Sequence, residues 1–302
     1  MEGDSCDGYT RELKKPTGMT IHRVQSQETL AGPARESNAA AKATWNAIAV
    51  GSQRAEGAAA GSEEYFQRIR KYRYEYETPF IPAWIRDANL SERNVLEIGV
   101  GNGIDAVDII RNGARYHGID ITRNHLVLTA RNLEQNGVTG TLIQGDLTTL
   151  NEVPGAPFGA VYSFGVLHHI AHERQMLNRI REVLVPGGSL IISVYSKYSF
   201  FNAYLVATWF IRGRGYSLDA WRSYLAEKSP LDRPVTIRVR SRGEVQRLLE
   251  SAGFRVIRYK KAGFVKRYLP VVGRFLSADG AVLNSLGALM GWYHLFTCER
   301  TD

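Results

Sequence analysis

Cysteine is scarce in this chain, and its scarcity excludes several kinds of small or metal-stabilised protein. Only Cys6 and Cys298 occur among the 302 residues, one near each end. Two distant cysteines build neither a disulfide framework nor a cysteine-rich zinc site, because both need several closely spaced thiols. We therefore expect no metal and a reducing, cytoplasmic compartment.

Long hydrophobic runs are also absent. The two most apolar late stretches, residues 198–211 and 281–296, are shorter than the roughly 20 residues that a spanning helix needs. The beginning of the chain has no basic segment followed by an apolar stretch and a cleavage site, so no secretory leader is expected. Residues 1–40 instead predict a flexible polar tail. Stable membrane insertion is not expected.

What the chain does contain is a regular alternation of short apolar runs and amphipathic segments. With 44% hydrophobic residues, a chain of this length can bury the core of one enzyme domain and an added lid. The alternation predicts a doubly wound α/β sheet, in which ligands bind at the carboxyl ends of the strands. The predicted strands cover residues 94–98, 115–119, 141–145, 159–163, 189–195, 254–259 and 292–298.

The most informative stretch follows the first of these strands. Its apolar residues suit a strand buried on both faces of a parallel sheet, and a helix is predicted over residues 104–112. Glycine has no Cβ, so a ligand can lie against the backbone of the turn between them. Asp120 closes the next strand about 20 residues later, where an acid can hold a ribose diol. The turn contains Gly99, Gly101 and Gly103.

Together with four further segments, this turn resembles the class I S-adenosylmethionine-dependent methyltransferases, in the small-molecule branch that includes ubiquinone and menaquinone methyltransferases. The segments are QGDL at 144–147, AVYSFGVLHH at 160–169, IREVLVPGG at 180–188 and LLESAGF at 248–254. The resemblance covers roughly residues 40–260. It implies a Rossmann-like seven-stranded sheet whose last strand inserts antiparallel, and it implies S-adenosyl-L-methionine as the cofactor.

The resemblance also implies which residues hold the cofactor. It places Asp146 against the adenine amino group, after the third strand. The candidate cofactor-binding residues are Glu97, Gly99, Gly101, Gly103, Asp120, Ile121, Asp146, Leu147, Ser163, Arg73 and Tyr65.

Residues 41–90 precede the methyltransferase domain at 91–302 and predict a helical lid. A short helix over 40–50 contains Trp45, and residues 62–86 place aromatic side chains at helical spacing. These aromatics either pack against the sheet or cover the cofactor. In the second case Arg73, whose guanidinium fork fits a carboxylate, would hold the methionine carboxylate.

The segment 196–242 interrupts the strand-helix rhythm after the fifth strand and predicts an insertion beside the acceptor site. Its aromatic first part, residues 198–211, either caps that site or forms an ordinary buried helix. The candidate acceptor-binding residues are Trp45, Tyr74, Tyr195, Tyr198, Phe201 and Tyr204.

Charge is unevenly distributed in a chain of net charge +8. Residues 212–242 hold eight basic and three acidic residues, and residues 254–274 hold seven basic residues and no acid. Such a basic rim favours an anionic acceptor, an acidic carrier or a membrane surface, or is simply a solvated face. Nucleic acid is not expected as a partner, because residues 163–166 lack the Asn/Asp-Pro-Pro-aromatic pattern that holds a flipped base.

The expected reaction is in-line attack of an acceptor atom on the sulfonium methyl group. Positioning and exclusion of water supply much of the acceleration, and a base is added where the nucleophile must lose a proton. His168 and His169 are the candidate bases, since histidine exchanges protons near neutral pH. A structural role is the alternative for this pair, with Tyr162, Tyr195 and Tyr198 as other candidate bases; a carboxylate acceptor would need none.

The sequence thus predicts methyl transfer to a small, partly apolar and anionic metabolite of specialised metabolism. O-methylation is slightly favoured over N- or C-methylation. Two alternatives stay open: a peptide or lipid methyltransferase at a membrane surface, and a cofactor-binding regulatory protein without turnover. Assembly into a homo-oligomer is left open as well.

Overall fold

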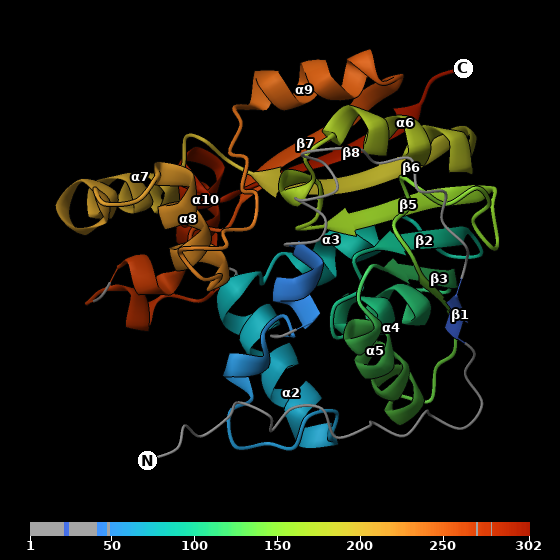
Figure 1. Ribbon diagram of the computed structural model, residues 1–302, viewed down its shortest axis with the longest axis horizontal. Helices are drawn as coiled ribbons and strands as arrows, with labels where there is room; N and C mark the ends of the chain where they lie inside the picture. Colours follow the sequence, from blue (N-terminus) through green and yellow to red (C-terminus); the bar gives the residue numbers. More distant parts are fainter. Residues whose placement is uncertain (1–20, 24–40, 47–48, 270, 279) are drawn as a thin grey trace.

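The computed structural model describes residues 21–23, 41–46, 49–269, 271–278 and 280–302, and the rest of the expected 1–40 tail lies outside them. Eight strands form one sheet in the order β1-β4-β3-β2-β5-β6-β8-β7 (Figure 1). They are β1 Ile21–Arg23, β2 Asn94–Ile98, β3 Arg115–Asp120, β4 Thr141–Gln144, β5 Phe158–Phe164, β6 Leu184–Tyr195, β7 Phe254–Ala262 and β8 Tyr293–Arg300.

The predicted doubly wound α/β fold is confirmed. From β2 the strand order runs through β3 and β4 on one side and through β5 and β6 on the other, so the winding reverses between β2 and β5. Strand β8 lies antiparallel between β6 and β7, as the resemblance implied. A crevice for a ligand is expected where the winding reverses, at the carboxyl ends of these strands.

The sheet has one strand more than the seven expected. The additional strand is β1, which falls within the segment expected to be a polar tail and pairs in parallel with β4. Two features explain it: Ile21 packs against the hydrophobic core, and β4 would otherwise be an edge strand with unpaired backbone groups. Strand β6 also begins earlier than expected, because Leu184 pairs with Phe158 before the register shifts.

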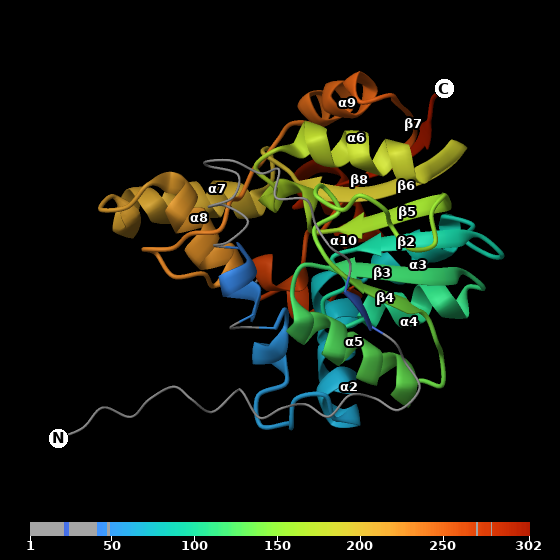
Figure 2. The same ribbon diagram turned by 45° about the vertical axis from the view of Figure 1, so that its right-hand side comes forward.

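Helices cover both faces of the sheet (Figures 1 and 2). Side chains alternate between the faces along each strand, so Val95 joins one core and Leu96 joins the other. The first core packs beneath α3 (Ile81–Asp87), α4 (Ile104–Arg111) and α5 (Arg123–Gln135). The second packs beneath α6 (Glu173–Val183) and α9 (Arg242–Ser251).

The helix predicted over residues 62–86 is interrupted. Helix α2 (Glu63–Tyr72) continues into one π-helical turn, η2 (Arg73–Glu77), and α3 starts only at Ile81. Pro79 explains the interruption, because a proline donates no backbone hydrogen bond and keeps the preceding residue out of helical geometry. Thr78 accordingly has φ −137° and ψ 57°.

The insertion after β6 contains α7 (Phe200–Thr208), the π turn η4 (Trp209–Gly213) and α8 (Leu218–Glu227). Ser199 and Ser217 cap α7 and α8, each accepting a hydrogen bond from a backbone N–H of the first turn. The chain then returns beside β6, where the Arg240 N–H donates to the Tyr195 carbonyl over 3.1 Å. The insertion is therefore anchored to the sheet at both of its ends.

A last helix, α10 (Ala281–Met290), connects β7 to β8 and lies on the same side of the molecule as α7 and α8 (Figure 1). Among the described residues, none of the helices combines the length and the apolar character that a membrane span requires.

Candidate active site

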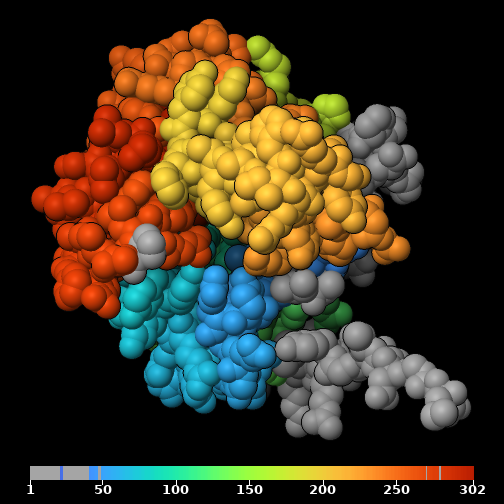
Figure 3. All heavy atoms as spheres, turned by 90° about the vertical axis from the view of Figure 1, so that its left-hand side faces the viewer, coloured from blue at the N-terminus to red at the C-terminus, as the bar shows by residue number. Residues whose placement is uncertain are grey.

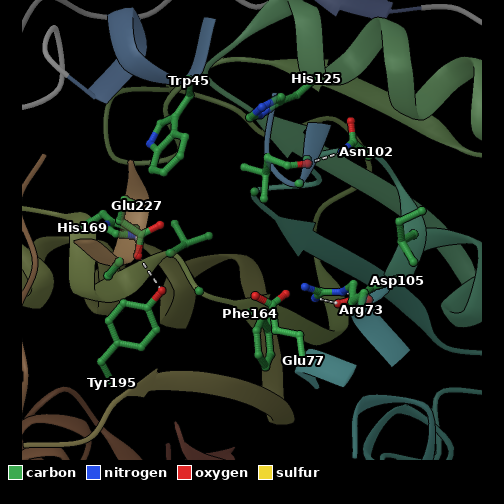
Figure 4. A pocket seen from close by; sticks show the side chains of 18 of the residues that line it. Trp45, Arg73, Glu77, Asn102, Asp105, His125, Phe164, His169, Tyr195 and Glu227 are labelled. Atoms are coloured by element: carbon green, nitrogen blue, oxygen red, sulfur yellow. Dashed lines mark hydrogen bonds and ion pairs between the residues drawn. The ribbon is translucent and has the colours of Figure 1, made fainter. Parts of the chain in front are cut away.

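A cavity of about 780 Å³ lies at the carboxyl ends of the central strands. Its two ends differ in chemistry. The cofactor half comprises the cavity residues of the glycine turn, of the segments after β3 and β4, and Arg73. The acceptor half comprises those around His169, from β5, β6, β8, the insertion and residues 263–268 (Figure 4).

The three glycines of the turn have positive φ for different reasons. A Cβ on Gly99 would lie 2.4 Å from a methyl group of Val166, and one on Gly103 would lie 2.8 Å from Thr129. Those two glycines are required by packing. Gly101 has φ 53°, and a Cβ built on it would have Val50 as its nearest neighbour, 4.0 Å away. Since Gly101 lines the cavity, this open space belongs to the cavity. Gly101 is therefore the position where a ligand can lie against the backbone.

Asp120 lies in the cavity at the end of β3, as the sequence predicted. Its Oδ1 accepts hydrogen bonds from the backbone N–H and the hydroxyl of Thr122, and its Oδ2 lies 3.2 Å from His125 Nδ1. Burial alone would raise its pKa, but the neighbouring His125 and the bonds from Thr122 outweigh burial and lower the pKa below its usual value. The carboxylate is thus ionised and held in one orientation.

The adenine-binding candidates also line the cavity. Ile121, Asp146 and Leu147 lie there together. Asp146 Oδ1 accepts bonds from the backbone N–H and the hydroxyl of Thr148, over 2.9 and 2.7 Å. The side chain is oriented by this local turn, which depends on a threonine two residues later.

Arg73, predicted to hold a carboxylate of the cofactor, faces a carboxylate of the protein. Its Nε and Nη2 donate to Asp105 over 2.9 and 2.5 Å, in a side-on pair. Burial would raise the pKa of Asp105, but Arg73 lowers it, so this acid stays ionised. Among the described residues no acceptor is bound by Nη1, so this donor of a cavity-lining arginine is left for a ligand.

Glu97 lies on the floor of the cavity and accepts a hydrogen bond of 2.6 Å from the Tyr116 hydroxyl. Burial, and next the nearby Asp105, raise the pKa of this carboxyl group well above its usual value. Glu97 is therefore protonated more readily than an ordinary glutamate.

The aromatic residues of the N-terminal helices were expected either to pack against the sheet or to cover the cofactor, and they divide between packing and lining the cavity. Trp45 lines the cavity, and its ring lies edge-on to His169 with centroids 5.7 Å apart. Tyr65 and Tyr74 do not line the cavity. Tyr65 packs in a core cluster and its hydroxyl donates to Asn102 of the glycine turn, while the Tyr74 hydroxyl donates to Asp105 over 2.9 Å. The predicted direct contacts of these two tyrosines are thus replaced by indirect ones.

His169 faces the acceptor half from the turn after β5. Its Nδ1 lies 2.7 Å from the Thr236 carbonyl oxygen, which can only accept, so Nδ1 is the donor, and in the neutral ring Nε2 carries the lone pair. Nε2 lies 3.8 Å from Glu227 Oε1. This arrangement suits a proton acceptor.

His168, the other candidate base, does not line the cavity. It is 1% exposed and stacks on the ring of Tyr195, with centroids 3.6 Å apart. Burial lowers its pKa well below the usual value, which keeps it neutral. The geometry gives His168 a packing role, since its ring has no access to an acceptor.

Tyr195 is held by the insertion. Its hydroxyl donates to Glu227 over 2.6 Å, and its ring stacks on Trp292 with centroids 4.3 Å apart. Burial, and next Glu227, raise its pKa well above the usual value, so Tyr195 stays protonated and is unsuited to act as a base.

Phe201 and Tyr204 of α7 also line the cavity, whereas Tyr198 does not and is 68% exposed. Ser163 is buried in β5 outside the lining.

Several lining residues were not anticipated from the sequence. His125 and Asn102 belong to the cofactor half, Glu77 lies beside Arg73 and Phe164, and Glu227 lies beside His169 (Figure 4). Glu77 ends the π turn that precedes Pro79. The proline in the sequence could have indicated that the helix breaks at this point. Glu227 gave no signal, because only the folding of the insertion brings it to His169.

The expected basic rim is partly neutralised. Arg238 and Arg240 both pair with Glu173, so they bind the returning chain to α6. Lys228 and Arg267 line the cavity itself.

One group of described residues, His168, His169 and Glu227, has potential metal-ligand atoms within 4.8 Å of one another. Tetrahedral zinc needs such atoms about 3.4 Å apart. These side chains would have to move closer together to hold an ion.

Methyltransferases are found among the known proteins with related sequences and among those with related structures, which also include a [4+2]-cyclase. Residues 95–188 match the family described as a methyltransferase domain. A mitochondrial ubiquinone biosynthesis O-methyltransferase from Arabidopsis thaliana is 23% identical over 193 residues, which cover 63% of this chain and 54% of that protein. The chain spans about half the length of the curated ubiquinone relatives it matches.

Two solved structures share the fold. Magnesium protoporphyrin IX methyltransferase from Synechocystis, solved with bound SAH, has a TM-score of 0.55 at 14% identity and covers 87% of this chain and 100% of its own. The 1,6-didemethyltoxoflavin-N1-methyltransferase from Burkholderia thailandensis has a TM-score of 0.54 at 15% identity and covers 92% and 95%. At such identities the similarity establishes the fold alone.

Proposed function

We propose, from the premise that residues 95–188 form a class I S-adenosylmethionine-dependent methyltransferase domain, that this chain transfers a methyl group to a small, partly apolar acceptor. One observation carries the proposal. A single cavity joins Gly101 and Asp120, at the predicted cofactor position, to an aromatic compartment that contains His169.

The cofactor half fits S-adenosyl-L-methionine. Asp120 would hold the ribose hydroxyls, Asp146 and Leu147 would contact the adenine, and Arg73 Nη1 would bind the carboxylate. Gly101 leaves room for the cofactor, and the buried His125 Nε2 lacks a hydrogen-bond partner among the described residues, so it is available to a polar group. When bound, the cofactor supplies an electrophilic methyl group on a sulfonium.

The acceptor half fits removal of a proton from a hydroxyl. Nδ1–H donation to the Thr236 carbonyl fixes the ring of His169 with Nε2 free to take the proton. The Glu227 carboxylate, 3.8 Å away, would stabilise the imidazolium that results, and Tyr195 holds Glu227 in place. Aromatic side chains would exclude water from the reacting atoms.

This arrangement favours O-methylation slightly over N- or C-methylation. The resembling proteins include O- and N-methyltransferases by name, so they do not decide the acceptor atom. Lys228 and Arg267 would suit an anionic group on the acceptor, and a metabolite of specialised metabolism in the cytoplasm is our preferred setting. Assembly into a homo-oligomer is left open.

A second candidate is methylation of a lipid at a membrane surface, which the exposed apolar side chains of α7 favour. We prefer a small acceptor because the cavity is lined from several sides by core aromatics. A regulatory protein without turnover is the third candidate, and the place of His169 in the cavity lining, with Nδ1 held by the Thr236 carbonyl, argues against it.

Calorimetric titration with S-adenosylmethionine and S-adenosylhomocysteine tests the cofactor. A panel of phenols, carboxylic acids and amines, with methylation followed by mass spectrometry, then tests the acceptor. Micromolar cofactor binding with methylation of phenols is the expected outcome. Cofactor binding without methylation of any acceptor would favour the regulatory alternative, and methylation of amines alone would contradict the preference for oxygen.

A further inference from the structure

Large apolar side chains are exposed on three neighbouring segments near the mouth of the cavity. They lie on the insertion, on the loop after β7 and on α10. Ile211 and Phe275 are each 76% exposed, and Leu289 is 72% exposed. Other exposed members are Tyr204, Phe210, Val271, Val272 and Val282. Exposed apolar side chains that gather in this way mark a binding surface more often than isolated ones do.

The three segments contact one another. Phe200 of α7 packs on Phe264 and Tyr268, with ring centroids 5.5 and 5.1 Å apart. Lys261 Nζ donates to the carbonyls of Tyr198 and Leu289, which ties the start of α7 to α10. Figure 3 looks onto this side of the molecule, where the yellow and orange insertion lies next to the red C-terminal segments. We call the exposed side chains of residues 204–214, 271–275 and 282–289 the docking face.

Positive charge outweighs negative charge near these apolar residues, because the sequence has one acid, Asp279, between the second and third segments and it lies outside the described residues. Residues 200–214 and 265–278 contain no aspartate or glutamate. Their basic residues are Arg212, Arg214, Lys266, Arg267 and Arg274. The guanidinium of Arg214 lies over the ring of Phe210, and that of Arg274 over the ring of Phe275. Among the described residues, Arg212, Arg214 and Arg274 form no ion pair, unlike Arg70, Arg238 and Arg240 elsewhere.

The docking face continues into the acceptor half. Tyr204 is 51% exposed and also lines the cavity, and Arg267 and Tyr268 line the cavity beside the loop of Phe275. An acceptor bound at the docking face could therefore enter the acceptor half of the cavity directly, without passing through the charged cofactor half.

We propose that the docking face binds the surface of an anionic lipid bilayer, with its apolar side chains among the acyl chains and its arginines at the phosphates. Apolar and basic residues together, with few acids, are typical of such peripheral binding. A second copy of this chain is a poorer partner, because it would bring equal positive charges together. The inference goes beyond the proposed function, and its test does not depend on methyl transfer.

The test is co-sedimentation of the full chain with two kinds of vesicle, one of phosphatidylcholine and one in which part of it is replaced by phosphatidylglycerol. The chain should bind the second kind, and more weakly as salt is raised. The variant Ile211→Ser with Phe275→Ser should lower the partition coefficient at least about tenfold. Arg212→Gln with Arg274→Gln should lower it about fivefold for each charge removed.

Two matched controls separate this face from general surface properties. Ile257→Ser removes an exposed apolar side chain of β7, and Arg115→Gln removes an exposed charge of β3, both outside the docking face. Neither should change vesicle binding. All variants should keep the S-adenosylmethionine affinity of the parent chain, since none of these residues lines the cavity.

Three outcomes would overturn the inference. They are no binding to anionic vesicles, equal binding by the parent chain and the serine double variant, and a dimer in solution that the serine double variant dissociates. The last outcome would make the face an interface between copies. Loss of cofactor binding in the parent chain would count against the proposed function and would leave the vesicle result intact.

Discussion

The two halves of the cavity are built in different ways. In the cofactor half, acids and bases are buried and already paired: Asp120 with His125 and Thr122, and Asp105 with Arg73. Thr122 and His125 directly follow the strand that ends at Asp120, whereas Arg73 reaches Asp105 from the π turn η2. In the acceptor half, Glu227 of the insertion and Trp45 of the N-terminal helix meet His169 across long stretches of chain.

The difference teaches which part of the molecule can change independently. In the cofactor half, Asp120 and Asp105 are each held in one orientation by hydrogen bonds from neighbouring side chains. The acceptor half depends on peripheral segments that can change without altering the sheet. If this comparison is right, changes in the first half alter cofactor affinity, and changes in the second alter the rate of transfer.

The largest effect is expected for Gly101→Val. The side chain would fill the space where the cofactor approaches the backbone, so the affinity for S-adenosylmethionine should fall by at least about a hundredfold. Calorimetric titration measures it. Gly137→Val is the matched control, because Gly137 has φ 64° and open space but lies outside the cavity. Equal losses in both variants would show that backbone strain, and not obstruction, is responsible.

His169→Ala should slow methyl transfer about a hundredfold or more and leave cofactor affinity unchanged, because only the proton acceptor is lost. Single-turnover rates with saturating cofactor measure this. His172→Ala removes a nearby exposed histidine outside the cavity and should have no effect. Undiminished transfer in His169→Ala would remove His169 as the base.

Asp120→Asn should weaken cofactor binding about ten- to a hundredfold, since charge-assisted hydrogen bonds to the ribose would be lost. The rate at saturating cofactor should change little. Asp108→Asn, in which the altered acid pairs with Arg70 away from the cavity, is the control. An unchanged affinity in Asp120→Asn would contradict the ribose role.

Glu227→Gln should slow transfer about tenfold, because the amide still accepts the Tyr195 bond but no longer stabilises a positive His169. Glu182→Gln, which alters an exposed pair with Arg179, should leave the rate unchanged. A changed cofactor affinity in Glu227→Gln would contradict the prediction that changes in the acceptor half alter only the rate of transfer.

The last effect concerns stability in acid and not methyl transfer. Burial lowers the pKa of His294 from its usual 6.5 to about 4 in the folded chain. Between these values the unfolded chain binds a proton that the folded chain does not, so stability is complete above pH 6.5 and falls as pH is lowered toward 4. The loss is about 3 kcal/mol over the whole window.

His294→Gln should reduce this loss, measured as the difference in the free energy of unfolding between pH 7 and pH 5. His294 Nε2 lies 3.1 Å from the Arg240 carbonyl oxygen, and this contact links β8 to the end of the insertion. Identical pH dependence in the parent chain and the variant would contradict the assignment.

Much of the fold was predictable, because the strands from β2 to β8 have local patterns of apolar residues between turns. The break at Pro79 was also predictable in principle. The pairing of β1 was not, since three residues in a polar segment give no pattern and only the uncovered edge of β4 fixes their place.

For the site, the sequence identified residues whose role depends on local geometry, such as Gly101 and Asp120. It was less successful where the role depends on distant contacts. Tyr65 and Tyr74 are aromatic residues on the expected helix, yet they contact the cavity only through other side chains. His168 and His169 are adjacent and chemically identical, and only their packing separates them: one faces Tyr195 in the core, the other the cavity.

By itself the sequence determined the doubly wound sheet, the glycine turn and the acids at the ends of β3 and β4, because hydrophobic period and glycine conformation act over a few residues. The tertiary structure alone decided which histidine lines the cavity, that Glu227 stands beside it, and that exposed apolar side chains of three separate segments lie near its mouth. These properties depend on distances between residues far apart in the chain, and only the packed chain fixes those distances.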